Sequence, residues 1–138
     1  VYKRQPQLIQ IDLNTGAGGN AVTLENDILP DAYDVMLGMA IDPISGQFYV
    51  VGFDFFLSQA HLFRLDETNG DLADITDALV VLSTNIIDGL TFGENNKMYG
   101  VTETGKLIEI NYENETIINS NSNTYYKNIR GVTYTDNN

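Results

Sequence analysis

The chain repeats a two-part phrase, and this repeat constrains its fold more than any other feature. A Gly followed by alternating apolar residues leads to an apolar-Tyr pair, and then to a Leu-x-x-apolar-Asp/Asn segment that ends in a turn. One full copy runs from Gly38 to Gly70 and another from Gly89 to Glu115. A half-copy from Leu8 to Gly16 precedes them, and a half-copy from Gly131 to Thr135 follows. The copies recur at intervals of roughly 40 to 55 residues, a period that indicates stacked β units.

Each full copy is predicted to form four short strands, because β-branched and aromatic residues alternate with period two and no helical spacing is sustained. The predicted strands are 37–42, 47–52, 61–66 and 71–76 in the first copy, and 87–92, 97–102, 106–111 and 115–119 in the second. Turn residues such as Pro43–Gly46 and Thr68–Gly70 separate them. Four-stranded antiparallel units at this period are the blades of β-propellers, so we expect an all-β propeller segment. A flat sandwich of stacked hairpins is the structural alternative.

The repeat also predicts how the chain is divided. Residues 1–5 are expected to be a non-native leader, because they hold two of the seven cationic residues and look foreign to the rest of the chain. The remaining units are a partial blade with its connector at 6–34, full blades at 35–83 and 84–124, and the first strand of a further blade at 125–138. Because the chain enters and leaves in mid-repeat, we expect a piece of a longer protein, with the remaining blades of the same propeller as its partners.

The segment Asp42–Val50 followed by Leu62–Asp66 resembles the repeat of bacterial lactonase-like and surface-layer-type β-propellers. Asp88–Phe92 resembles the blade opening of NHL and gluconolactonase-like propellers. The chain contains no Trp, and in this it departs from the quinone-cofactor, Kelch and WD-repeat propellers. The resemblance implies a propeller fold. It implies no single activity, since propellers serve as hydrolases, oxidoreductases, ligand binders and scaffolds.

The leading functional hypothesis is a non-catalytic module, used for binding or as a scaffold, in a secreted or cell-surface bacterial protein. The expected location is extracellular or periplasmic, although no signal peptide is visible. The alternative is a fragment of a propeller hydrolase or lactonase with most catalytic residues on blades outside this chain. No catalytic residue is assigned, because His61 is the only histidine and no nucleophile elbow or phosphate-binding loop is present.

Composition excludes several classes of partner. The net charge of −12 repels phosphate groups, so nucleic acid and anionic membranes are not expected to bind. No apolar run approaches the roughly 18 residues that predict a membrane span. Because cysteine is absent, the chain can form neither disulfides nor Cys-based zinc sites. No cofactor is expected, and calcium is the one metal with which a segment of the sequence is compatible.

Most of the repeated residues are expected to be structural. They are glycines that let inner strands approach (Gly38, Gly89, Gly131), tyrosines that fill the space between blades (Tyr49, Tyr99) and turn residues that accept backbone hydrogen bonds (Asp12, Asp66, Asn111). Function is therefore expected where the repeat breaks.

The first break is the residue before the repeated Gly, which is Leu37, then Asp88, then Arg130. If the inner strands begin at one mouth of a central channel, Asp88 and Arg130 face it from neighbouring blades. They are then candidates for binding a ligand. The alternative is a pair of solvated charges at strand ends, which require no function.

The second break is an apolar insertion between the second and third strands of the first copy, at 53–61. It carries Phe53, Phe55 and Phe56. A loop of this composition either packs over the neighbouring blade or forms an exposed apolar patch that binds a protein partner.

The third break is the acidic stretch 66–74, in which Asp66, Asp71 and Asp74 are candidate calcium ligands, since oxygen ligands in a tight turn suit a hard cation. The EF-hand pattern is not met, because Gly70 falls one position early and no Glu closes the loop. A plain hairpin turn is the alternative.

Overall fold

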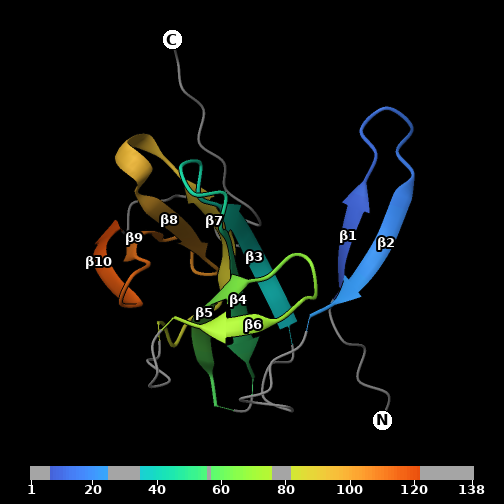
Figure 1. Cartoon of the computed structure of the whole chain (residues 1–138). Helices are drawn as coiled ribbons and strands as arrows, with labels where there is room; N and C mark the ends of the chain where they lie inside the picture. The colour runs from blue at the N-terminus through green and yellow to red at the C-terminus, as the bar shows by residue number, and fades with distance from the viewer. Residues whose placement is uncertain (1–6, 25–34, 56, 76–81, 122–138) are drawn as a thin grey trace.

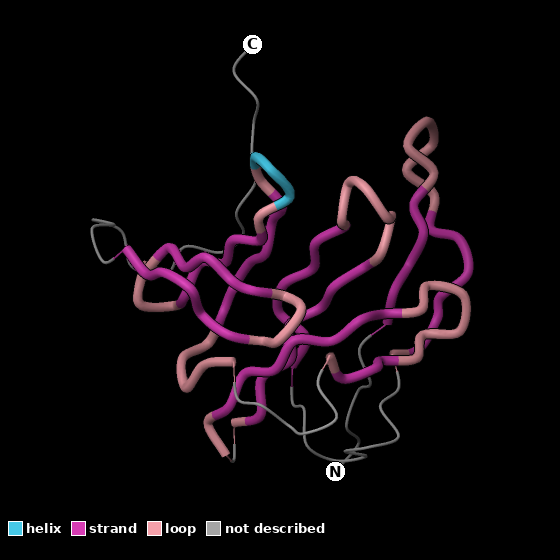
Figure 2. The backbone as a smooth tube through the Cα atoms, turned by 60° about the vertical axis from the view of Figure 1, so that its left-hand side comes forward, coloured by secondary structure: helices cyan, strands magenta, loops and turns pink. Residues whose placement is uncertain are grey.

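The computed structural model describes residues 7–24, 35–55, 57–75 and 82–121, and these residues form antiparallel β structure with one short helical turn (Figures 1 and 2). The all-β class is thus confirmed. Within these ranges no helix is long and apolar enough to cross a membrane. The predicted leader at 1–5 and the predicted strand within 125–138 lie outside the described residues.

The strands form three units. The hairpin consists of β1 (Gln7–Ile11) and β2 (Gly18–Thr23). The first sheet consists of β3 (Val35–Ile41), β4 (Phe48–Asp54), β5 (Gln59–Leu65) and β6 (Leu72–Asp74). The second sheet consists of β7 (Ile87–Phe92), β8 (Met98–Thr102), β9 (Leu107–Asn111) and β10 (Thr116–Asn121), and the turn η1 (Glu94–Asn96) joins its first two strands. Each sheet is an antiparallel meander in sequence order, and its strands begin and end within two residues of the predicted positions.

Four turns between neighbouring strands share one hydrogen-bonding pattern. At each of four turns an Asp or Asn side chain accepts the N–H group of the residue two positions later, and the Oδ1–N distances are 2.8 Å for Asp12, 2.8 Å for Asp42, 2.9 Å for Asp66 and 3.0 Å for Asn111. Such Asx turns bring the chain back on itself. The expected turn role of Asp12, Asp66 and Asn111 is confirmed.

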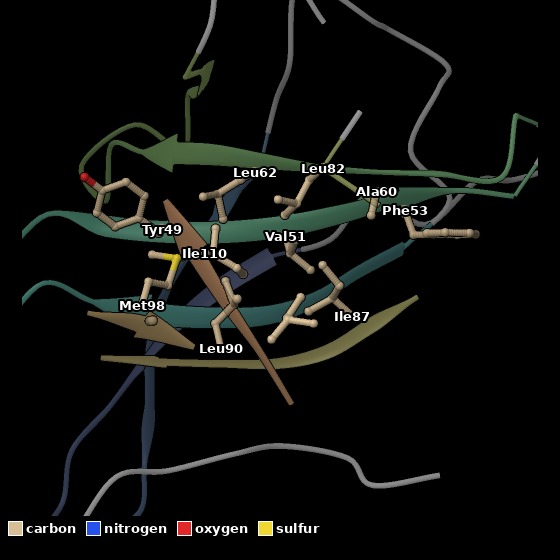
Figure 3. Close-up of a cluster of buried hydrophobic side chains, with 12 residues drawn as sticks. Tyr49, Val51, Phe53, Ala60, Leu62, Leu82, Ile87, Leu90, Met98 and Ile110 are labelled. Carbon is tan, nitrogen blue, oxygen red and sulfur yellow. The ribbon is translucent and has the colours of Figure 1, made fainter. Parts of the chain in front are cut away.

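The two four-stranded sheets pack face to face through the larger apolar core (Figure 3). Side chains of the first sheet such as Val51 and Leu62 meet side chains of the second such as Ile87 and Ile110, and all four are at most 2 % exposed. Tyr49 lies at one end of this core, where its ring contacts Phe92 and Tyr112, with centroids 5.8 and 5.3 Å away. Its predicted role in filling the space between the sheets is confirmed.

The opposite face of the first sheet packs on the hairpin. This smaller core consists of buried residues of the first sheet, with Leu8 and Leu24 packed against it: Val50, Phe63, Leu65 and Leu72. The hairpin, the first sheet and the second sheet therefore follow one another in space in the order in which they occur in the chain. The first sheet thus lies between the hairpin and the second sheet.

The predicted loop over 53–61 is wrong in its extent. Phe53 and Asp54 belong to β4, and 59–61 belong to β5, so the connection between the strands is short. Phe53 pairs with Ala60 across the two strands, and both side chains are buried in the larger core. Strands β4 and β5 are longer than the sequence pattern predicted, because their apolar residues at this end continue the core.

The inner strands β3 and β7 approach each other closely at a pair of glycines. A Cβ atom added to Gly38 would lie 3.1 Å from the Cα and carbonyl carbon of Gly89 and from the N atom of Leu90. This distance is shorter than ordinary van der Waals contact with backbone atoms, which cannot rotate away. The predicted crowding of the inner strands at Gly38 and Gly89 is thus confirmed.

We predict that Gly38→Ala destabilises the chain by about 1–3 kcal/mol, the usual cost of overpacking a tight interior. Urea unfolding measures the change in the free energy of unfolding. Gly18→Ala is the matched control, because its added Cβ would meet Ile9 Cγ2 at an ordinary 3.5 Å. Equal stability of the two variants would contradict the close packing of β3 on β7.

A second prediction concerns the turn at Asp42. The Ser45 hydroxyl and the Ile44 N–H group hold the pKa of Asp42 below its ordinary value of 3.8. Because the folded pKa is the lower one, the Asp42 carboxylate stabilises the fold above about pH 4, and this stabilisation is lost as the pH falls through the folded pKa. We expect Ser45→Ala to raise the pKa of Asp42 in an NMR titration. The pKa of Asp12 in the same sample is the internal control and should not change.

Candidate functional site

Asp88, the predicted ligand-binding residue of the inner strand, occupies a β-bulge. Ile87 pairs with Thr102 and Gly89 pairs with Val101, so Asp88 is the additional residue on β7. Leu37 is the additional residue at the same place on β3. Bulges of this kind redirect a side chain away from the regular alternation of the strand. Arg130 lies outside the described residues, so the predicted pairing of Asp88 with Arg130 stays a prediction.

The apolar residues proposed for partner binding do not share one environment. Phe53 is 4 % exposed and belongs to the larger core, so its side chain presents no surface to a partner. Phe55 is 51 % exposed and contacts the Phe53 ring edge-on, with centroids 5.1 Å apart. Phe56 lies outside the described residues. Among the described residues of this turn, Phe55 and Leu57 expose apolar surface.

The acidic stretch 66–74 forms a turn and the start of β6. The Asp66 carboxylate accepts hydrogen bonds from the Thr68 hydroxyl and N–H group, which lower its pKa. The Asp71 carboxylate accepts a hydrogen bond from the Asn69 amide at 2.6 Å. Asp74 lies in β6. In the part of the chain that the structure describes, no three His, Asp or Glu side chains are grouped so as to hold a metal ion.

Glu115 is the residue of interest that the sequence reasoning missed. The turns that begin at Asp12, Asp42 and Asp66 each place a Gly four residues later, with φ of +69°, +74° and +85°. The turn that begins at Asn111 has Glu115 at this position, with φ of +56°. A non-Gly residue in this left-handed conformation costs about 1–2 kcal/mol, so its side chain requires a compensating interaction.

The Glu115 side chain supplies this interaction by reaching across to the first sheet. Its carboxylate is completely buried, and its Oε1 accepts the N–H group of Leu62 on β5 at 2.6 Å. The same oxygen lies 3.8 Å from Nδ1 of His61, whose side chain is 4 % exposed. The contact joins residues 53 positions apart in the sequence.

Glu115 fills a gap along the edge of β5. β6 is short and pairs with 63–65 only, while Ala60 on the same edge exchanges backbone hydrogen bonds with Leu82 and Ser83. The N–H group of Leu62 falls between these two pairings. A buried N–H group without an acceptor is costly, so the carboxylate takes the place of the strand that β6 does not extend far enough to provide.

The buried contact of Glu115 with His61 and Leu62 therefore links the second sheet to the first. The side chains of Glu115 and His61 are shielded from solvent, so a substrate in solution would reach neither of them. His61 is enclosed within the packing of the sheets. The signal for Glu115 was present in the sequence, as the one turn of the four in which the expected Gly is replaced.

We predict that Glu115→Ala destabilises the chain by about 1–3 kcal/mol, because it leaves the buried N–H group of Leu62 without its acceptor. Glu115→Gln should lose less, since the amide oxygen can still accept the hydrogen bond. Glu113→Ala, an exposed change in the same turn, is the matched control and should be close to neutral. Thermal unfolding of the three variants measures the difference. Equal losses of stability for Glu115→Ala and Glu113→Ala would contradict the stabilising role of the Glu115 contact.

Comparison with known proteins assigns the chain to no family. The chain matches no protein-family model, and a search of curated proteins finds no match to it.

Proposed function

We propose that this chain is a segment of a β-propeller that serves as a non-catalytic binding or scaffold module of a secreted or cell-surface bacterial protein. The observation that carries the proposal is the directional packing of the repeat units. Phe63 and Leu65 of the first sheet face the hairpin, and the equivalent Ile108 and Ile110 of the second sheet face the first sheet. Each unit thus turns the same repeat positions toward the unit before it, as blades around an axis do.

The distribution of contacts between the sheets supports a radial arrangement over a flat stack. The first strands β3 and β7 are in close contact, with backbone against backbone at Gly38 and Gly89. The backbones of the outer strands of the two sheets lie farther apart, and side chains such as Leu62 and Ile110 fill the space between them. Sheets that approach at their first strands and diverge at their last are wedge-shaped, and wedges placed side by side close into a ring.

The non-catalytic role is supported by the position of the one histidine of the chain, His61. His61 is buried beside Glu115 and takes part in holding the two sheets together. The bacterial, secreted or cell-surface setting rests on the resemblance of Asp42–Val50 and Leu62–Asp66 to propeller repeats.

Tandem chains test the radial arrangement. We would join two, three and four copies of 35–121 through 75–86, the segment that connects the two sheets in the chain, and measure their maximum dimension by small-angle X-ray scattering. Propellers contain about four to eight blades, so the maximum dimension should stop growing once two to four copies have closed the ring. A maximum dimension that grows in proportion to copy number would favour the flat stack. Tandem chains with Gly38→Val in every copy are the control, because they prevent the approach of β3 to β7.

A further inference from the structure

The hairpin exposes apolar side chains at repeat positions that both four-stranded sheets bury. Ile9 and Ile11 of β1 are 49 % and 58 % exposed. The equivalent residues of β5 and β9 are almost fully buried: Phe63 (0 %), Leu65 (1 %), Ile108 (2 %) and Ile110 (2 %). The hairpin thus retains the sequence of a packed unit without the packing.

The face of the first sheet that the hairpin covers is only partly covered. Met39 and Ile41 on β3 are 45 % and 48 % exposed. On the opposite face of the same strand, where β7 lies alongside, Ala40 is 7 % exposed. The hairpin corresponds to the third and fourth strands of a unit, and among the described residues no counterpart of β7 lies against this face. Leu8 of β1 and Met36 of β3 pack on one buried cluster, which places the open face beside β1.

The edge of β1 away from β2 is also open to pairing. The N–H group of Asp12 bonds to the Ala17 carbonyl beyond the end of β2, so the N–H groups of Ile9 and Ile11 are directed to the other edge, because they alternate along a strand. Within the described ranges β1 pairs with β2 alone, whereas the equivalent edges of β5 and β9 pair with β4 and β8. Neither β1 nor β2 carries a charged residue or a Pro, the features that protect edge strands from pairing.

We propose that this open edge of β1, with the backbone N–H groups of Ile9 and Ile11 and the exposed side chains of Met39 and Ile41, is a docking surface for an antiparallel β-hairpin. The proposal rests on the proposed function, in which such a hairpin forms the first two strands of the unit to which β1 and β2 belong. The bound hairpin adds a strand to the exposed edge of β1, and strand addition is a common mode of peptide recognition.

The register of the complete sheets specifies the partner. The strand next to β5 reads Phe48-Tyr49-Val50-Val51, and the strand next to β9 reads Met98-Tyr99-Gly100-Val101. In both pairs the Tyr lies opposite the residue equivalent to Gln10, which is Arg64 in β5 and Glu109 in β9. The docked strand therefore has the pattern apolar-Tyr-x-Val, with its Tyr opposite Gln10. The strand before it covers Met39 and Ile41 as β7 covers the other face of β3.

A synthetic peptide of residues 86–103, which spans β7 and β8, is the probe, and the full chain is the target. We expect saturable binding in fluorescence anisotropy, and amide hydrogen exchange at Ile9 and Ile11 about tenfold slower or more in the complex. The same peptide with Val101→Pro is the control and should not bind, because Pro cannot pair within a sheet. On the target, Ile41→Asp should weaken binding about tenfold or more, while Ile44→Asp, an exposed change in the turn after β3, should not.

A fusion keeps the test decisive if the isolated hairpin does not hold its structure in water. A copy of residues 86–106 placed directly before Leu8, in place of 1–7, reproduces the junction of Lys106 with Leu107 and supplies the hairpin at high effective concentration. We expect a higher melting temperature and slowed exchange at Ile9 and Ile11 relative to a fusion with the copied segment scrambled. A fusion without this protection overturns the proposal.

The remaining outcomes separate this surface from other occupants and from the proposed function. If the full chain alone self-associates in sedimentation and protects Ile9 and Ile11 as its concentration rises, the surface joins copies of the chain and the hairpin partner is rejected. If the peptide binds while the tandem chains grow in proportion to copy number, the surface stands and the propeller is rejected. If the tandem chains close and neither peptide nor fusion protects β1, only the docking surface is rejected.

Discussion

The arrangement of the sheets depends on the contact between β3 and β7. Because Gly38 has no side chain, the two inner strands meet backbone to backbone, and the larger residues farther along each sheet fill the space that opens from this contact. A side chain at Gly38 would separate the strands and leave cavities among residues such as Val51 and Ile87, which are now fully buried. The close approach therefore sets both the distance between the sheets and the shape of the core.

The fold class and the strands of both sheets could be predicted because their residues alternate with period two and end at Asp-initiated turns. The segment 53–61 was predicted poorly because its run of aromatic residues breaks that alternation. Only the presence of the second sheet, which buries Phe53 and Ala60, shows that the strands continue there. The alternation of residues in the sequence predicts the ends of a strand well where the strand contacts mainly its own sheet. It predicts them poorly where packing against another sheet determines which residues are buried.

The candidate site could be predicted only in part, for a related reason. The replacement of a turn Gly by Glu115 is visible in the sequence, but the atom that its carboxylate meets depends on how two units pack. The same turn position in the first sheet holds Gly70, where an added Cβ would collide with the Thr23 carbonyl. In the hairpin it holds Gly16, with nothing within 4 Å of an added Cβ. One repeat position is thus a contact point between units, and its residue is fitted to the neighbour that it meets.

The Glu115 contact has a consequence for the order in which the protein forms during synthesis. Leu62 emerges 53 residues before its acceptor. During synthesis the N–H group of Leu62 therefore obtains this acceptor only after the last turn of the second sheet has been made.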